Sequence, residues 1–183
     1  MPRGDGLTAE QPIERVVLVG FMGSGKTVVA HALSRVLGWD RVDLDEWIEA
    51  STGRSVADLF AERGEAEFRR LETAATEAAA DRRRLVVSTG GGWALNPTHW
   101  TVLREGSVFV WLRAAERTLR ARLSADGVVR PLLAGHKPEA RLHEMLEARS
   151  PLYEQADLIV DTDHLSPAGV AGEILKQMRE CGR

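Results

Sequence analysis

The stretch that decides the fold reads Gly20-Phe21-Met22-Gly23-Ser24-Gly25-Lys26-Thr27. It directly follows the apolar run 16–19 and opens the segment 26–37, whose apolar residues recur at helical spacing and which ends before Gly38, a favoured C-cap residue. A glycine-rich loop between a strand and a helix can curl its N–H groups around an anion at the positive end of the helix dipole. The G-x-x-x-x-G-K-[ST] pattern in this context predicts a phosphate-binding loop rather than an ordinary glycine-rich turn.

The chemistry of the loop residues predicts their roles. Backbone N–H groups of Gly23, Ser24 and Gly25 would surround phosphate oxygens. Lys26 would reach the β- and γ-phosphates, and the Thr27 hydroxyl would be a ligand of Mg²⁺. We therefore expect a phosphate chain to bind here with Mg²⁺ beside it.

Length and composition limit the class of protein. The chain has 183 residues, 44% of them hydrophobic, which favours one well-buried domain. Its net charge of −3 gives no basic excess for nucleic acid or an anionic membrane, and its single cysteine, Cys181, allows no disulfide within the chain. No apolar run approaches the roughly 20 residues that span a bilayer. We expect a soluble cytoplasmic monomer that binds neither nucleic acid nor membrane.

Strand and helix patterns alternate along the chain. The first 14 residues lack an apolar signal region and are expected to form a disordered arm, followed by a single domain over residues 15–183. Further strands are predicted at 41–43, 85–88, 108–112 and 158–160, and helices at about 45–50, 65–80, 97–104, 115–123 and 166–178. A further helical stretch is predicted up to Phe60, with Ser55 as its N-cap. This order predicts a three-layer α/β fold with a parallel sheet of about five strands flanked by helices and ligands at the carboxyl ends of the strands.

The pattern lapses over about 124–138, which is longer than a typical connection and contains Gly127 and Gly135. We interpret this segment as a lid. It carries Arg130, which a closing loop could bring onto the phosphates.

Two carboxylates follow the predicted second strand, in Asp43-Leu44-Asp45. Alternation by two would put both on one side of an extended chain, so that one could support the Mg²⁺ and the other could orient and deprotonate a hydroxyl. The alternative is that one of them is only a helix N-cap.

Two further arginines and a glycine run are candidates for binding an anionic acceptor. Arg69 lies near Phe60 and Phe68, and its guanidinium is suited to bidentate binding of a carboxylate, although a surface ion pair is the commoner role. Arg149 precedes Ser150-Pro151, which we interpret as a break between helical segments. The run 90–92 is all glycine, which lets backbone amides approach a ligand closely, although a simple flexible loop is the alternative.

Taken together, these segments resemble the shikimate kinase family, small phosphate-loop kinases with the nucleoside-monophosphate-kinase-like fold. The resemblance runs from about Val16 to Met178 and rests on an ordered set of motifs. These are the loop 20–27, Asp43-Leu44-Asp45 with Ile48-Glu49, the runs 52–56 and 64–72, Thr89-Gly90-Gly91-Gly92, Arg130-Pro131-Leu132-Leu133 and Arg149-Ser150-Pro151-Leu152-Tyr153.

The resemblance implies phosphorylation of the shikimate 3-hydroxyl by ATP, within aromatic amino-acid biosynthesis. It implies that Lys26 and Thr27 bind ATP and Mg²⁺, that Asp43 supports the metal through water, and that Asp45 acts on the hydroxyl. The residues implied to hold the shikimate carboxylate are Arg69, Arg149 and the amides near Gly91 and Gly92. Arg130 would close over the phosphates, and Arg122 would lie against the adenine.

One position departs from the family pattern, which usually has a small residue after the glycines where this chain has Trp93. We expect this ring to turn into the core rather than reshape the acceptor pocket.

The rival interpretations are a kinase of the same fold acting on gluconate or on a shikimate-like acid, a GTP-dependent switch, and a motor or transporter ATPase. The switch would need an Asn-Lys-x-Asp motif, and the only asparagine in the sequence is Asn96. The ATPase would need an acidic residue at the end of a strand next to the strand that precedes the phosphate-binding loop. Asp161 follows a predicted strand, but we expect that strand near the edge of the sheet.

Overall fold

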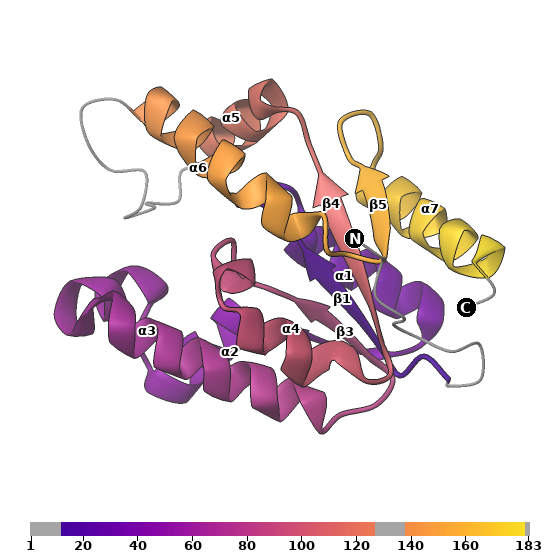
Figure 1. The fold of residues 1–183 in the computed structure, drawn as a ribbon, viewed down its shortest axis with the longest axis horizontal. Helices are drawn as coiled ribbons and strands as arrows, with labels where there is room; N and C mark the ends of the chain where they lie inside the picture. The colour runs from indigo at the N-terminus through magenta and orange to yellow at the C-terminus, as the bar shows by residue number, and fades with distance from the viewer. Residues whose placement is uncertain (1–11, 127–137, 182–183) are drawn as a thin grey trace.

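A computed structural model describes residues 12–126 and 138–181 of the chain. The strands are β1 (Arg15–Val19), β2 (Asp40–Asp43), β3 (Leu85–Ser88), β4 (Ser107–Arg113) and β5 (Leu158–Asp161). The helices are α1 (Lys26–Leu37), α2 (Leu44–Thr52), α3 (Val56–Ala80), the short 3₁₀ helix η1 (Trp93–Leu95), α4 (Pro97–Arg104), α5 (Glu116–Ala125), α6 (Pro138–Tyr153) and α7 (Pro167–Glu180). The order of elements along the chain is shown in Figure 1.

The strands form one parallel sheet in the order β2-β3-β1-β4-β5. This confirms the predicted five-stranded α/β fold, and β5 lies at the sheet edge, as expected for Asp161. In the register of the sheet, Asp43 pairs with Ser88 and Ser88 pairs with Leu18. The carboxyl ends of β2, β3 and β1 therefore meet at one edge, where ligands bind in open α/β sheets.

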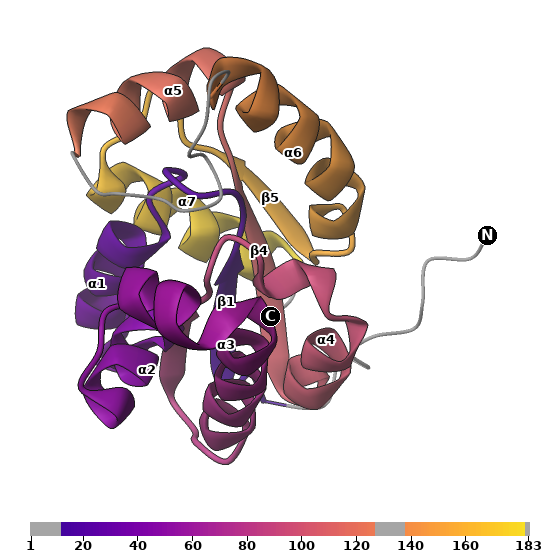
Figure 2. The same ribbon diagram turned by 90° about the vertical axis from the view of Figure 1, so that its left-hand side faces the viewer.

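Two apolar cores lie on the two faces of the sheet, which makes the fold three layers deep. Val16 and Leu18 of β1 pack with α1 and α7, whereas Val17 and Val19 pack with the core that includes α2, α3 and α4. Figure 2 shows α1 and α7 on one side of the strands and α4 and α6 on the other. Because both faces are covered, residues 16–19 of β1 are all apolar, without alternation.

The phosphate-binding loop depends on glycine at its first position. Gly20 has a φ of +144°, and a Cβ there would lie 2.7 Å from the carbonyl oxygen of Leu112 on β4. A side chain would be strained in this backbone and would collide with β4, so only glycine allows the chain to leave β1 this way. The loop then enters α1 at Lys26, as the sequence predicts.

A break within α3 follows the predicted pattern. Gly64 has φ 77° and ψ 173° inside the range of α3, which is non-helical backbone within an otherwise helical segment. The sequence predicts one helical run up to Phe60 and another from Glu65, with Ser55 as the N-cap. The Ser55 side chain indeed accepts a hydrogen bond from Asp58 N.

The predicted break at Arg149 is wrong. Arg149 lies inside α6, which continues through Pro151 to Tyr153. Proline removes one helical hydrogen bond, but the last turn is held by tertiary packing because Tyr153 is buried in the core. The proline therefore marks the final turn of the helix rather than its end.

The ends of the predicted lid are helical. Ser124 and Ala125 belong to α5 and Pro138 begins α6, while most of that segment, with Arg130, lies outside the described residues. Of the predicted arm, residues 1–11 also lie outside them, and Glu14 N donates to Gly106 O at 2.8 Å. No helix in the described part of the chain is both long enough and apolar enough to cross a membrane.

Candidate active site

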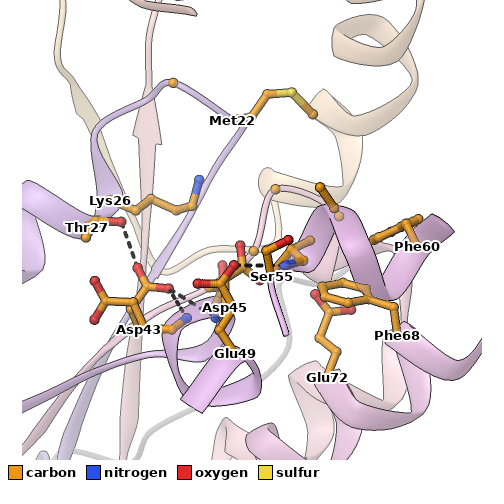
Figure 3. Close-up of a pocket in the computed structure, with 18 of the residues that line it drawn as sticks. Met22, Lys26, Thr27, Asp43, Asp45, Glu49, Ser55, Phe60, Phe68 and Glu72 are labelled. Carbon is orange, nitrogen blue, oxygen red and sulfur yellow. Dashed lines mark hydrogen bonds between the residues drawn. The ribbon is translucent and has the colours of Figure 1, made fainter. Parts of the chain in front are cut away.

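A cleft of about 710 Å³ opens at the carboxyl ends of β1, β2 and β3. The phosphate-binding loop and α2 form part of its wall, the glycine run 90–92 forms another part, and α3 contributes Phe60, Phe68, Arg69 and Glu72. Figure 3 shows Lys26, Thr27 and Asp43 on one side of this pocket and Phe60 and Phe68 on the other. The cleft thus joins a charged end to an aromatic end.

In the phosphate-binding loop, Lys26 folds back over the curve of the chain. Its Nζ donates hydrogen bonds to the carbonyl oxygens of Gly20 (2.8 Å) and Phe21 (2.9 Å), and the residue is 7% exposed. Ser24 is also buried, and its hydroxyl has no hydrogen-bond partner among the described residues. The loop therefore holds a cation and a buried polar donor where the sequence predicts a phosphate chain.

Asp43 joins three segments through one carboxylate. Its Oδ2 accepts hydrogen bonds from the hydroxyls of Thr27 and Ser88, both at 2.7 Å. Its Oδ1 accepts from the backbone N–H groups of Asp45 and Glu46, which makes it the N-cap of α2. Asp43 is therefore a helix cap as well as a neighbour of Thr27.

The expected extended geometry of Asp43 and Asp45 is wrong. The capping bonds end β2 at Asp43 and start the helix at Leu44, so Asp45 lies in the first turn of α2. Alternation by two does not apply beyond the cap. Both side chains nevertheless line the same cleft.

The carboxylate of Asp45 sits in an unfavourable place for a negative charge. Its Oδ1 is buried without a hydrogen-bond partner among the described residues. Burial first, and then the charges of Asp43 and Glu72, raise the pKa of Asp45 to about 7, although the Lys26 ammonium acts in the opposite direction. A carboxyl with a pKa in this range can both release and accept a proton near neutral pH.

Arg69 and Glu72 form an ion pair on one face of α3. Nη1 of Arg69 donates to Oε2 of Glu72 at 2.8 Å, and its Nη2 lies 3.0 Å from Oε1 of Glu65. Glu72 is fully buried, and burial raises its pKa despite the guanidinium. The Arg69 guanidinium also lies 5.4 Å from the centre of the Phe68 ring, which matches the aromatic setting that the sequence indicated.

The glycine run approaches this pair closely. A Cβ at Gly92 would lie 2.6 Å from Nη2 of Arg69, and one at Gly91 would lie 3.1 Å from the N atom of Met22 in the phosphate-binding loop. Glycine at these positions therefore lets the backbone pass between the loop and α3. The close packing accounts for glycine at these positions, rather than the flexibility of a loop.

Arg149 reaches the same glycine run from α6. Its Nη1 donates to Gly91 O at 3.0 Å, and the hydroxyl of Tyr153 donates to the same oxygen at 2.8 Å. Burial, together with the like charge of Arg69, lowers the pKa of Arg149. The structure thus brings Arg69, Arg149 and the glycine run together.

Arg122 of α5 connects the phosphate-binding loop to the segment after β5. Its Nη1 lies 3.4 Å from the carbonyl oxygens of Gly23 and Ser24, and its Nη2 donates to Thr162 O at 2.8 Å. The implied contact of Arg122 with adenine stays a prediction. The predicted contact of Arg130 with the phosphates does too, since Arg130 lies outside the described residues.

Trp93 turns into the core, as expected. It is fully buried, packs near His99, Trp100 and Phe109, and does not line the cleft. The ring therefore does not narrow the pocket directly.

Two residues of this site had no role assigned from the sequence. Glu72 pairs with Arg69, and Tyr153 shares the carbonyl of Gly91 with Arg149. The spacing of three between Arg69 and Glu72 on a predicted helix was the available signal for the first pair. Nothing local indicated the second, because it joins α6 to a distant turn.

Comparison with known proteins identifies the family. The shikimate kinase family model matches residues 22–179. The shikimate kinase of Thermodesulfovibrio yellowstonii is 40% identical over 165 residues, which cover 90% of this chain and 95% of that protein. A structure of Acinetobacter baumannii shikimate kinase in complex with shikimate is 32% identical and has a TM-score of 0.88, covering 94% of this chain and 97% of that one.

The rival gluconate kinase is similar only in fold. A gluconokinase structure from Sinorhizobium meliloti is 22% identical with a TM-score of 0.60, covering 94% of this chain and 95% of that one. The shikimate kinase family model spans most of the phosphate-binding loop, the Asp45 region and both arginines of the site. The chain belongs to the shikimate kinase family.

Proposed function

We propose that this chain transfers the γ-phosphoryl group of ATP to the 3-hydroxyl of shikimate, giving ADP and shikimate 3-phosphate for aromatic amino-acid biosynthesis. The observation that carries the proposal is the convergence of the phosphate-binding loop, Asp45 and Arg69 on one cleft. Phosphoryl transfer depends chiefly on positioning and charge stabilisation, and these groups supply both.

The acceptor would bind at the end of the cleft that carries Arg69. Arg69 and Arg149 are close enough for the charge of one to lower the pKa of the other, so an anion near them is favoured. A guanidinium pairs with both oxygens of a carboxylate, and the amides near Gly91 and Gly92 would add donors. The acid group of shikimate would thus orient its ring, with Phe60 and Phe68 as apolar neighbours in the cleft.

Asp45 would receive the proton of the acceptor hydroxyl. Its pKa of about 7 places it close to the pH at which a general base works best. Lys26, with Gly23, Ser24, Gly25 and Thr27, would hold the phosphates of ATP. Arg130 would neutralise charge on the transferred group, a role that rests on the sequence alone.

Mg²⁺ is the proposed metal, and the residues fit it. The Thr27 hydroxyl and the Asp43 carboxylate lie 2.7 Å apart beside the phosphate-binding loop and are hard oxygen donors, the type that Mg²⁺ prefers. Thr27 would hold the ion directly and Asp43 through water. When bound with ATP, Mg²⁺ would neutralise charge on the β- and γ-phosphates.

A coupled assay of ADP release tests the proposal, with shikimate, quinate and gluconate compared side by side. We expect ATP-dependent turnover with shikimate that EDTA abolishes and Mg²⁺ restores. The Lys26→Ala variant, purified in the same way, controls for contaminating kinases. Turnover with gluconate and none with shikimate would contradict the proposal.

A further inference from the structure

One face of α3 carries four polar residues that contact the glycine run or the residues that follow it. Arg69, Glu72, Thr73 and Thr76 are spaced by three, four and seven positions from the first, so they share one side of the helix. A Cβ at Gly92 would lie 2.6 Å from Nη2 of Arg69, and a Cβ at Gly90 would lie 3.0 Å from Oε1 of Glu72. Gly90 and Gly92 therefore lie close against this face, and a methyl group at either position would require a neighbouring side chain to move.

The next residue attaches the run to the same face. Nε1 of Trp93 donates a hydrogen bond to Oγ1 of Thr76 at 2.9 Å, and this Thr76 hydroxyl donates to Glu72 O at 2.7 Å. A hydroxyl has one proton to donate and lone pairs to accept, so both bonds can exist together. All three residues are buried, and the connection is therefore protected from water.

His99 fixes the backbone of Trp93 from the other side. Its Nδ1 lies 3.1 Å from Trp93 O, and since a carbonyl only accepts, Nδ1 carries the proton. Asn96 Oδ1 accepts from Thr98 N at 3.0 Å, so the Asn96 amide group faces Nε2 of His99, 3.1 Å away, and donates to it. Nε2 also lies 2.9 Å from Thr73 Oγ1 on α3. The ring is therefore neutral, and it contacts both Trp93 and Thr73 of α3.

We propose that Trp93 is a positioning residue for the acceptor site. By holding the turn 90–92 in register with α3, its indole sets where the Arg69 guanidinium lies. Glycines have no side chains to hold themselves in place, so the anchored side chain of the next residue contributes to their position, together with the hydrogen bonds that Gly91 O accepts. Small displacements of binding groups reduce catalysis markedly. The identity of the acceptor rests on the proposed function, whereas the positioning of Arg69 does not.

Trp100 offers a matched control. It lies in the same aromatic cluster, is 5% exposed, and its Nε1 donates to Ala94 O at 3.2 Å, within the segment that follows the glycines. Trp93→Phe and Trp100→Phe each remove one indole N–H and a similar volume. Only the first removes a bond to α3.

Steady-state kinetics of the two variants test the proposal. Trp93→Phe should raise the shikimate KM by about fivefold or more, the effect expected for loss of one hydrogen bond, with the ATP KM little changed. Trp100→Phe should leave both constants within about twofold. Thr76→Val should match Trp93→Phe, and the double variant should be no worse than either, because both changes remove the same bond. Equal KM values for the two tryptophan variants, or additive effects in the double variant, would overturn the proposal.

A substrate-free measurement separates this inference from the proposed function. In ¹⁵N-labelled protein, Trp93→Phe should shift the Arg69 Nε–H resonance and the amides of Gly90, Gly91 and Gly92, whereas Trp100→Phe should shift them little. If the wild type does not phosphorylate shikimate, the proposed function fails and this spectrum alone decides the role of Trp93. Unchanged Arg69 and glycine resonances in Trp93→Phe would show that the indole does not position the site.

Discussion

Asp45 and Glu72 direct carboxylate oxygens to the same side of Gly90. A Cβ on Gly90 would lie 2.9 Å from Oδ1 of Asp45 and 3.0 Å from Oε1 of Glu72. Neither oxygen has a hydrogen-bond partner among the described residues. Two carboxyls enclosed this closely favour holding a proton, which agrees with the raised pKa of both groups.

Asp45→Asn should lower kcat with shikimate by roughly 10²–10⁴-fold, the usual loss when a general base is removed. The ATP KM should change little, because the phosphate-binding loop is untouched. Glu49→Gln is the matched control: Glu49 also lines the cleft, but its Oε1 accepts from Val56 N, and an amide oxygen preserves that bond. An unchanged kcat in Asp45→Asn would remove Asp45 from the mechanism.

The same variant should be more stable than the wild type at alkaline pH. The pKa of Asp45 is about 7 in the folded protein and about 3.9 in an unfolded chain. At a pH between these two pKa values, the folded state binds a proton that the unfolded state has released. The contribution of Asp45 to stability therefore falls as the pH rises from about 4 to about 7. The amide that replaces the carboxyl in Asp45→Asn cannot ionise, so the variant avoids this loss.

Thermal unfolding without ligand at pH values of about 5 and about 8, on either side of the folded pKa, checks this expectation. The gain in Tm of Asp45→Asn over the wild type should be larger at the alkaline value than at the acidic one. A gain that is equal at both values, or larger in acid, would show that the carboxyl does not titrate as described.

Gly92→Ala should weaken acceptor binding without unfolding the protein. Gly92 has φ −102° and ψ −2°, which alanine adopts without strain, but its Cβ would lie 2.6 Å from the Arg69 guanidinium. The flexible end of Arg69 would move aside, so the shikimate KM should rise while Tm falls little. Gly172→Ala on α7 is the control, since a Cβ there meets nothing within 4 Å and alanine favours a helix. An unchanged shikimate KM in Gly92→Ala would mean that Arg69 does not need its present place.

His99 should make the protein sensitive to acid. Burial lowers its pKa, and the neutral ring accepts from Asn96, so protonation breaks a buried contact. The folded pKa lies below the unfolded value of about 6.5, so this stability is present above that unfolded value and is lost as pH falls through the folded pKa. Tm of His99→Leu should be lower than that of the wild type but should fall less between pH values of about 7 and about 5.

His143 offers a comparison with His99, because its pKa is shifted in the opposite direction. Its hydrogen bond to Glu116 raises its pKa, so its pairing stabilises the fold below about pH 6.5 and is lost as pH rises through the raised value. In His143→Gln, Tm should therefore fall more steeply than in the wild type as the pH is lowered. If the Tm of His99→Leu falls with acid as steeply as that of the wild type, the neutral His99 ring is not the acid-sensitive group.

The sequence predicts the parts of this protein that depend on local rules. The loop 20–27 and the N-cap at Ser55 follow from short-range backbone requirements, and the parallel sheet follows from the alternation of patterns. The end of β2 at Asp43 agrees with the prediction, whereas the extended geometry considered for Asp43 and Asp45 is wrong because the capping bonds of Asp43 start α2 at Leu44. The continuation of α6 through Pro151 was missed because it depends on the burial of Tyr153.

The candidate site was predictable in its members but not in their pairings. Arg69, Arg149 and the glycine run were named from residue chemistry and resemblance. The contact of Arg149 with Gly91 and the pairing of Glu72 with Arg69 depend on how α6 and α3 meet a distant turn. The hydrogen bond from Trp93 to Thr76 spans 17 positions in sequence and has no local signature.

Arg149→Lys should raise the shikimate KM strongly and the ATP KM little. Lysine keeps the positive charge and can still donate to Gly91 O, but it cannot also present the planar fork that pairs with both oxygens of a carboxylate. Arg69→Lys should have the same effect. Arg120→Lys is the control, because Arg120 is exposed and pairs with Glu139 on the surface.

Tyr153→Phe separates the role of Arg149 in binding from a role in holding the turn. It removes the second donor to Gly91 O while leaving the guanidinium in place. If Arg149 acts on the acceptor, Arg149→Lys should raise the shikimate KM much more than Tyr153→Phe does. If the two variants raise the KM for shikimate and ATP alike, Arg149 only supports Gly91, and the acceptor carboxylate must be bound by Arg69 without it.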